Sequence, residues 1–231
     1  MIDVTVLEHE RVDDLLVNGL KIIQNPSAFC FGCDAVEIAN FVSGGKKDRA
    51  VDLGSGTGII TLLLAGKKGI PCVGIEIQSD MAKMANRSIA LNGLDNAKVI
   101  NARMQDVAQH MQAGSATIVV TNPPYAKANS GKSAESESVA LARTELAVTL
   151  REVVECASYL LSTGGSFYIV HRADRMAEVI SECTKVRLEP KILQVLTPAK
   201  NKKPHLFLLK AVKDGKTGLE ILSQREVDTW V

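Results

Sequence analysis

A cluster of glycines lies directly after one short apolar run and directly before another. The sequence reads V-D-L-G-S-G-T-G over Val51–Gly58, and the apolar run that leads into the cluster is Ala50–Leu53. Glycine adopts backbone conformations that other residues resist, and it lets backbone amides approach a ligand closely. Ile59–Gly66 then has the character of a helix that ends at a glycine. The pattern predicts a strand, a tight ligand-binding turn and a helix in succession. The glycines of the turn are Gly54, Gly56 and Gly58.

Apolar segments of strand length alternate with segments of helical spacing along the rest of the chain. Further strands are predicted at Cys72–Ile75, Ala97–Ile100, Thr117–Thr121, Ser166–Val170, Ile192–Leu196 and Leu206–Val212. Further helices are predicted at Asp34–Val42 (with Asp34 as N-cap), Asp80–Asn92, Val139–Leu161 and Arg175–Thr184. The alternation predicts an α/β, Rossmann-like fold with a mostly parallel, seven-stranded sheet covered on both faces. We expect a C-terminal antiparallel hairpin and a single domain, with residues 1–33 as a short extension and 34–231 as the core.

The glycine spacing and the acids near it indicate which cofactor fits the turn. The spacing is G-x-G-x-G, whereas dinucleotide-binding turns carry G-x-G-x-x-G. Asp52 adds a negative charge, which favours a cationic aminoacyl group and opposes a pyrophosphate. Glu76 ends the second strand, where a carboxylate can accept both hydroxyls of a ribose. Asp106 follows the third strand, where it would meet the adenine edge of the cofactor. These residues favour S-adenosylmethionine over NAD.

A stiff turn follows the predicted strand Thr117–Thr121. It is Asn122-Pro123-Pro124-Tyr125, and each proline fixes its own φ and biases the preceding residue toward extended geometry. An amine conjugated to a ring or carbonyl is a poor nucleophile. The Asn122 amide oxygen and the Pro123 carbonyl can accept its two N–H groups and stabilise the charge developing on the nitrogen. Tyr125 can stack on a planar substrate. The motif predicts methylation of a planar amine, with these four residues as the catalytic group and Asn122 also near the cofactor.

Composition sets wider bounds. The formal net charge of +1 neither requires nor excludes a nucleic-acid partner, because such partners need a local basic surface. No apolar run reaches membrane-spanning length, and the N-terminal residues lack the pattern of a secretion signal, so we expect a cytoplasmic protein without a membrane partner. The five cysteines are an odd number, which argues against a disulfide framework. Cys30 and Cys33 lack two further ligands at suitable spacing, so we expect no metal.

With both motifs in place, the chain resembles the class I, Rossmann-like methyltransferases that act on amines. It resembles more closely the bacterial tRNA adenine-N6 methyltransferases of the valine-tRNA type. Besides the two motifs and Glu76, the resemblance is carried by Glu10–Leu15, Ile22–Asn25, Phe29–Val36, Ala142–Glu145 and His171–Met176. It implies methylation of an adenine amine in a tRNA anticodon loop, with Asn122 and Tyr125 catalytic. It also implies cofactor contacts from Asp52, Gly54, Glu76 and Asp106. The segment Ala142–Glu145 reads A-R-T-E, where a histidine is expected before the glutamate.

A tRNA or another structured RNA needs a basic surface beside the catalytic turn. Carboxyl ends of parallel strands share one edge of the sheet, so the loops after three strands should meet there. We expect that edge to bind RNA phosphates. The residues expected to do so are Lys127, Lys132, Arg172, Lys200, Lys202 and Lys203.

Other functions fit parts of the sequence. A methyltransferase for a protein glutamine side chain would use the same Asn-Pro-Pro-Tyr chemistry, but usually has a helical N-terminal domain. A DNA adenine methyltransferase usually needs a target-recognition region for which there is little room. A non-catalytic RNA-binding module would not need the intact tetrapeptide, and the glycine spacing disfavours an NAD-dependent oxidoreductase.

Overall fold

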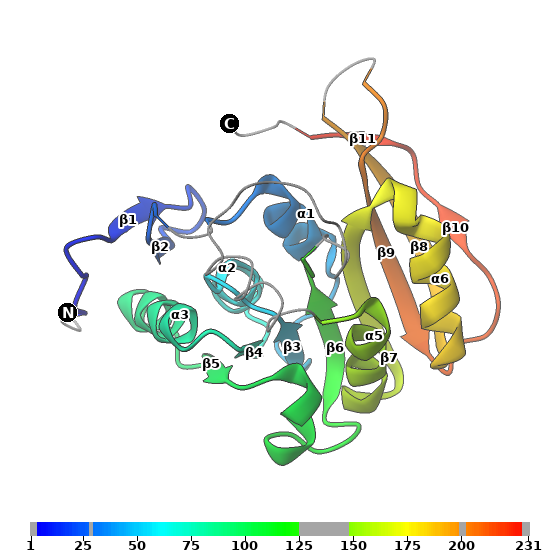
Figure 1. Cartoon of the computed structure of the whole chain (residues 1–231), viewed down its shortest axis with the longest axis horizontal. Coiled ribbons are helices and arrows are strands. Elements are labelled where there is room, and N and C mark those ends of the chain that lie inside the picture. Colours follow the sequence, from blue (N-terminus) through cyan, green and yellow to red (C-terminus); the bar gives the residue numbers. More distant parts are fainter. Residues whose placement is uncertain (1–3, 28–29, 125–147, 199–201, 228–231) are drawn as a thin grey trace, which may run out of the picture.

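The computed structural model describes residues 4–27, 30–124, 148–198 and 202–227 (Figure 1). A twisted sheet runs through its centre, and helices cover both faces. Its strands are β3 (Ala50–Leu53), β4 (Cys72–Glu76), β5 (Ala97–Asn101), β6 (Ala116–Thr121), β7 (Leu161–Arg172), β8 (Leu188–Thr197), β9 (Leu206–Lys213), β10 (Glu220–Ile221) and β11 (Arg225–Glu226). The main helices are α1 (Cys33–Phe41), α2 (Ile59–Leu62), α3 (Ser79–Leu91), α5 (Leu150–Leu160) and α6 (Met176–Lys185).

The order of the sheet is β10-β8-β9-β7-β6-β3-β4-β5, and β11 also pairs with β8. β3 to β7 are parallel to one another, whereas β9 runs antiparallel to both β7 and β8. β8 is therefore parallel to β7, as the predicted C-terminal hairpin requires. The structure confirms the mostly parallel Rossmann-like sheet and adds two short strands, β10 and β11, which pair in parallel with β8.

Two apolar cores lie on opposite faces of the sheet. α1, α2 and α3 pack on one face and α5 and α6 on the other (Figure 1). All four residues of β3 are buried, because a central strand between two helical layers has no solvent face. β3 carries the glycine turn at its carboxyl end, so the most protected strand of the sheet positions that turn.

Several predicted helix boundaries move. α1 begins after Gly32, which is its N-cap, so Asp34 lies in the first turn and is not the cap. The helix predicted over Val139–Leu161 is not continuous, because Val148 and Thr149 are not helical and α5 starts at Leu150. Thr149 is extended and forms a capping box with Glu152. The part of that prediction before residue 148 lies outside the described residues. After α2, the chain continues as a π-helical turn, Leu63–Lys67.

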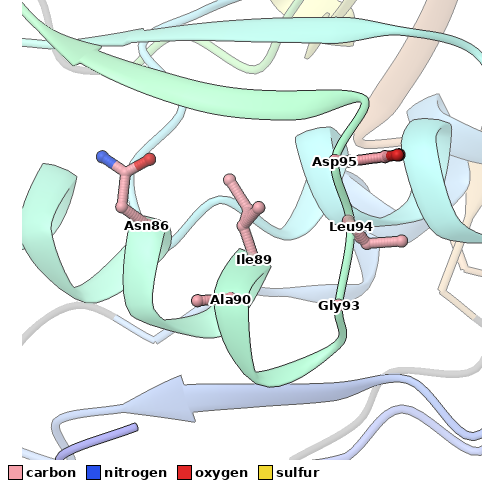
Figure 2. A pocket seen from close by; sticks show the side chains of 6 residues that line it. All are labelled: Asn86, Ile89, Ala90, Gly93, Leu94 and Asp95. Atoms are coloured by element: carbon pink, nitrogen blue, oxygen red, sulfur yellow. The ribbon is translucent and has the colours of Figure 1, made fainter. Parts of the chain in front are cut away.

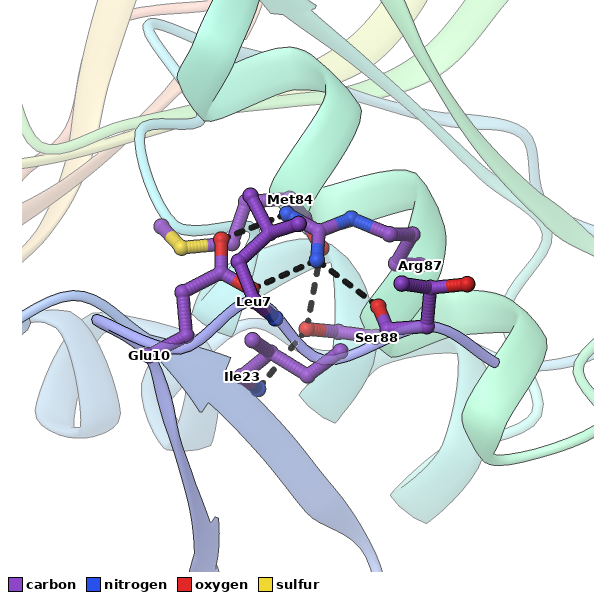
Figure 3. Close-up of polar contacts among 7 residues, drawn as sticks. Leu7, Glu10, Ile23, Met84, Arg87 and Ser88 are labelled. Carbon is purple, nitrogen blue, oxygen red and sulfur yellow. Dashed lines mark hydrogen bonds and ion pairs between the residues drawn. The ribbon is translucent and has the colours of Figure 1, made fainter. Parts of the chain in front are cut away.

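The N-terminal residues form a hairpin that packs against α3. β1 (Arg11–Asp14) and β2 (Lys21–Gln24) pair antiparallel. Ile23 N–H donates to Ser88 Oγ at 2.9 Å, and Arg87 makes a two-point ion pair with Glu10 at 2.5 and 2.6 Å (Figure 3). The N-terminal segment is thus held on the helix by a buried hydrogen bond and a part-buried ion pair. The division of the chain between residues 33 and 34 stays a prediction.

In the described part of the chain, no helix is both long and apolar enough to cross a membrane.

Candidate active site

The glycine turn has the geometry that its sequence predicts. Gly54, Gly56 and Gly58 have φ values of 73°, 52° and 82°, in the left-handed region that favours glycine. Gly54 N–H and Ser55 N–H both donate to the Ile75 carbonyl, at 2.9 and 3.0 Å. These bonds fasten the turn to β4, the neighbouring strand. Gly58 is the N-cap of α2, so the turn leads directly into the amino end of a helix.

Glu76 links the turn to the end of β4. Its Oε2 accepts from Gly56 N–H at 2.8 Å, and its Oε1 accepts from Gln78 N–H at 2.9 Å. The side chain is buried, at 5% exposed. A carboxylate has about four acceptor sites, so these two bonds leave room for the hydroxyls of a ribose. Glu76 therefore also shapes the turn, which the sequence did not indicate.

Asp52 lies within the protein, beneath the turn. Its Oδ2 accepts from Thr61, by the backbone N–H at 3.2 Å and the hydroxyl at 2.9 Å. Its buried Oδ1 has no hydrogen-bond partner among the described residues. Burial raises the pKa of Asp52 to about 7, the Thr61 bonds oppose that shift, and the charge of Glu76 adds to it. A buried carboxylate oxygen without a partner fits a cationic ligand, which would supply the missing compensation.

The Asn-Pro-Pro turn that begins at Asn122 lies beside the glycine turn. Leu53 and Thr121 are direct partners across β3 and β6, so Asn122 and Gly54 each follow paired residues on neighbouring strands. The Thr121 hydroxyl donates to the Leu53 carbonyl at 2.8 Å, which ties the two strand ends together. Asn122 is half-buried. The structure thus brings the two sequence motifs to one edge of the sheet.

The two prolines after Asn122 differ in exposure. Pro123 is buried and Pro124 is exposed. Tyr125 lies outside the described residues, as do Ala142–Glu145.

Asp106 lies in a short 3-10 turn, Met104–Gln109, and is half-buried. A Cβ placed on Gly54 would lie 4.0 Å from Met104 Cε, so this turn lies next to the glycine turn. Asn101, which the sequence did not single out, donates to the carbonyls of Glu76 and Ile77 at 2.9 and 2.8 Å. It fixes the chain directly after β4. In the sequence, the only indication of this role is the position of Asn101 at the end of β5.

The basic residues expected at the carboxyl edge of the sheet differ in exposure and in ion pairing. Lys202 and Lys203 are exposed in the β8–β9 loop, at the carboxyl end of β8. Arg172 is also exposed but pairs with Asp174 at 2.7 Å. His171 is 1% exposed, and burial lowers its pKa to about 4, so it adds no charge near neutral pH.

Lys127, Lys132 and Lys200 lie outside the described residues. Their part in the expected basic edge therefore stays a prediction.

A shallow hollow lies at the carboxyl end of α3 (Figure 2). The residues that line it are Asn86, Ile89, Ala90, Gly93, Leu94 and Asp95. They lie around the last turns of α3 and the link into β5, near the amino ends of the strands. The motifs lie at the carboxyl ends, so this hollow is not part of the candidate active site.

Within the ranges that the structure describes, no group of three His, Cys, Asp or Glu side chains is arranged to hold a metal ion. Cys30 and Cys33 are free and half-buried.

Comparisons with known proteins agree with this geometry. The profile of the family described as Methyltransferase small domain matches residues 35–203. A tRNA1(Val) (adenine(37)-N6)-methyltransferase of Shewanella woodyi is 25% identical over 183 residues, which cover 77% of this chain and 74% of that protein. A release factor glutamine methyltransferase of Haemophilus influenzae is 30% identical over 138 residues, 53% of this chain and 46% of that protein.

A solved structure shows the same fold. The structure of M. jannaschii TYW2 in complex with AdoMet superposes with a TM-score of 0.63 at 17% identity, covering 90% of this chain and 88% of that one. The family match spans most of the chain and includes both the glycine turn and the Asn-Pro-Pro turn. The prediction of a methyltransferase is confirmed, and the chain belongs to the methyltransferase small domain family.

Proposed function

We propose that this protein transfers a methyl group from S-adenosylmethionine to the exocyclic N6 amine of an adenine in tRNA, in the anticodon loop. The observation that carries the proposal is the pairing of Leu53 with Thr121. It sets an Asn-Pro-Pro turn beside a glycine turn at the carboxyl edge of one sheet. A site for a cationic nucleoside cofactor and two acceptors for a planar amine are then neighbours.

The residues around the glycine turn fit this cofactor. Backbone amides of the turn and the amino end of α2 lie where the ligand would meet the sheet. Glu76 would accept the ribose hydroxyls, Asp106 would meet the adenine edge, and Asp52 would balance the positive charge. When bound, S-adenosylmethionine supplies an electrophilic methyl group.

Asn122 and Pro123 would hold the amine. The Asn122 amide oxygen and the Pro123 carbonyl accept one N–H each, which turns the nitrogen lone pair toward the cofactor site. The same acceptors stabilise the positive charge that grows on nitrogen during attack. The nitrogen would gain the methyl group as the bond between that group and the cofactor sulfur breaks, which leaves a neutral thioether, and the nitrogen would release one proton to solvent. Holding the two reactants in line supplies much of the remaining acceleration.

A tRNA substrate is supported by the relatives and by the exposed lysines. The Shewanella woodyi relative is named for adenine 37 of tRNA1(Val). In this chain, Lys202 and Lys203 lie in the loop at the carboxyl end of β8, on the edge of the sheet that carries Asn122. Phosphate contacts from such a loop would hold the RNA while the target base leaves its stack and enters the site.

A protein glutamine amide is the second candidate. The Haemophilus influenzae relative favours it, because an Asn-Pro-Pro turn would serve a planar amide as well as an aromatic amine. The described residues 11–24 form a β-hairpin, which adds no support for this candidate.

One assay separates the two substrates. Purified protein is incubated with methyl-labelled S-adenosylmethionine and either total tRNA or total protein from a strain lacking the gene. We expect label in tRNA, recovered as N6-methyladenosine by nucleoside mass spectrometry, and no label with the Asn122→Ala variant. Label in protein, recovered as methylglutamine, would replace the proposal with the second candidate. Label in neither fraction would contradict both.

A further inference from the structure

Gly74, in the middle of β4, makes room for a residue of the cofactor turn. It pairs with Asp52 on β3 and with Val99 on β5, so its own backbone lies within the sheet and not in a loop or turn. Its φ does not lie in the left-handed region, unlike that of the glycines of the turn. Backbone conformation therefore does not explain a glycine here, and the space around it does.

The space beside Gly74 is filled by Ser55. A Cβ on Gly74 would lie 2.8 Å from Ser55 Oγ, 2.9 Å from Ser55 Cβ and 2.9 Å from Val99 Cγ2. Separations below about 3.0 Å are closer than carbon atoms pack in proteins, so a neighbour would have to move. Any side chain at this position would push on the turn, on β5, or on both.

Ser55 anchors the glycine turn through two backbone hydrogen bonds. Its N–H donates to the Ile75 carbonyl at 3.0 Å, and its carbonyl accepts from Gly58 N–H at 2.8 Å. The next residue, Gly56, donates to Glu76 at 2.8 Å. Displacement of Ser55 would therefore change the contacts of the turn with β4 and with Glu76 together. Its side chain is 5% exposed, so it has little solvent space into which to move.

We propose that Gly74 is a positioning residue for the cofactor. The missing side chain of Gly74 leaves the space that Ser55 fills, and Ser55 in that place fixes the position of the glycine turn relative to β4. The proposal rests on the proposed role of the glycine turn in holding S-adenosylmethionine. It differs from a general packing role in one respect. A side chain at position 74 should weaken cofactor binding by displacing Ser55, and displacement of Val99 should not have this effect.

The test is a comparison of double variants. Cofactor affinity is measured by calorimetry with S-adenosylmethionine alone, and Tm is measured on the same samples. Gly74→Ala should weaken binding by about tenfold or more, the size expected when one methyl group overpacks a tight site. Gly74→Ala with Ser55→Gly should bind as well as Ser55→Gly alone. Gly74→Ala with Val99→Ala should bind as weakly as Gly74→Ala.

Several results of these measurements would overturn the proposal. Unchanged affinity in folded Gly74→Ala overturns the proposal, as does recovery by Val99→Ala without recovery by Ser55→Gly. If Gly74→Ala does not fold, Ser55→Val approaches the same contact from the turn, and normal affinity in that variant overturns the proposal. Glu76→Ala tests the underlying site: if it also binds normally, the cofactor lies elsewhere, whereas weak binding by Glu76→Ala alone rejects only the role of Gly74.

Discussion

The proposed cofactor side and the proposed substrate side, both at the carboxyl ends of the parallel strands, are built by different means. Around the glycine turn, the contacts are made by backbone amides and by two buried carboxylates, Asp52 and Glu76. Around the end of β7, the charged groups are exposed or paired with near neighbours, as Arg172 is with Asp174. Chemistry carried by the backbone leaves a compact sequence motif, whereas a surface assembled from separate side chains does not. We expect the two sides to act independently as well, so that a change on one side leaves the other intact.

The largest effect should come from Asn122. Asn122→Ala removes one of two oriented acceptors, so turnover should fall by about two to three orders of magnitude. Because the cofactor side is held by other groups, affinity for S-adenosylmethionine should change little. Single-turnover methylation and calorimetry on the same sample measure both quantities. A large drop in cofactor affinity would show that the two sides are coupled.

Glu76 should give the reverse pattern. Glu76→Ala should weaken cofactor binding by about 1.5–3 kcal/mol, because charge-assisted hydrogen bonds to the ribose are removed. Glu76→Gln keeps an acceptor for Gly56 N–H and is the matched control, so it should retain part of that affinity. Calorimetry on both variants checks this. Equal affinity of wild type and Glu76→Ala would remove this residue from the site.

Asp52 should make cofactor binding depend on pH. With its pKa at about 7, the free protein holds Asp52 mostly neutral below pH 7 and ionised above it. A cationic ligand favours the ionised form, so affinity should rise with pH and level off above about 7. The expected difference between pH 6 and pH 8 is about tenfold. In Asp52→Asn the rise should vanish, and a wild-type affinity that is flat over this range would contradict the assignment.

Asp52 should also make the stability of the cofactor-free protein depend on pH, with stability falling as pH rises. A carboxyl group whose pKa is raised on folding contributes stability that is complete below its unfolded pKa, near 3.9, and lost as pH rises through about 7. Without cofactor, this group should lower the free energy of unfolding between about pH 4 and 7. Denaturant titrations of wild type and Asp52→Asn measure the difference.

The smallest effect per residue should come from the lysines of the β8–β9 loop. Replacing Lys202 and Lys203 by alanine should flatten the salt dependence of tRNA binding, by about 0.7 in log–log slope for each phosphate that the loop no longer binds. Lys46 and Lys47, exposed before β3 at the opposite edge of the sheet, are the matched control and should leave the slope unchanged. Equal slopes in both double variants would show that RNA docks elsewhere.

Sequence reasoning is most successful where short-range chemistry determines structure. The glycine turn, Glu76 and Asn122 are all expected at the carboxyl ends of strands, and the structure places them there. The prediction of one continuous helix over Val139–Leu161 is wrong at Val148 and Thr149, although Thr149-Leu-Arg-Glu152 is a recognisable capping box.

Other features have no local signal. β10 and β11 are two residues each and exposed, so they show no hydrophobic alternation. The contact of Gly74 with Ser55 depends on how two strands are stacked side by side, which is a property of the fold and not of either segment.

The position of β9 bears on the order in which this sheet can assemble and open. β9 lies between β7 and β8, and among the described residues β8 joins the rest of the sheet only through β9, because β10 and β11 pair with β8 alone. β8 can therefore join the sheet only after β9, which follows it in the chain, has paired with β7. Once formed, β8 with β10 and β11 can detach while the β7–β9 ladder persists. Amide protons of β8 should then exchange with solvent through local openings that those of β7 do not share.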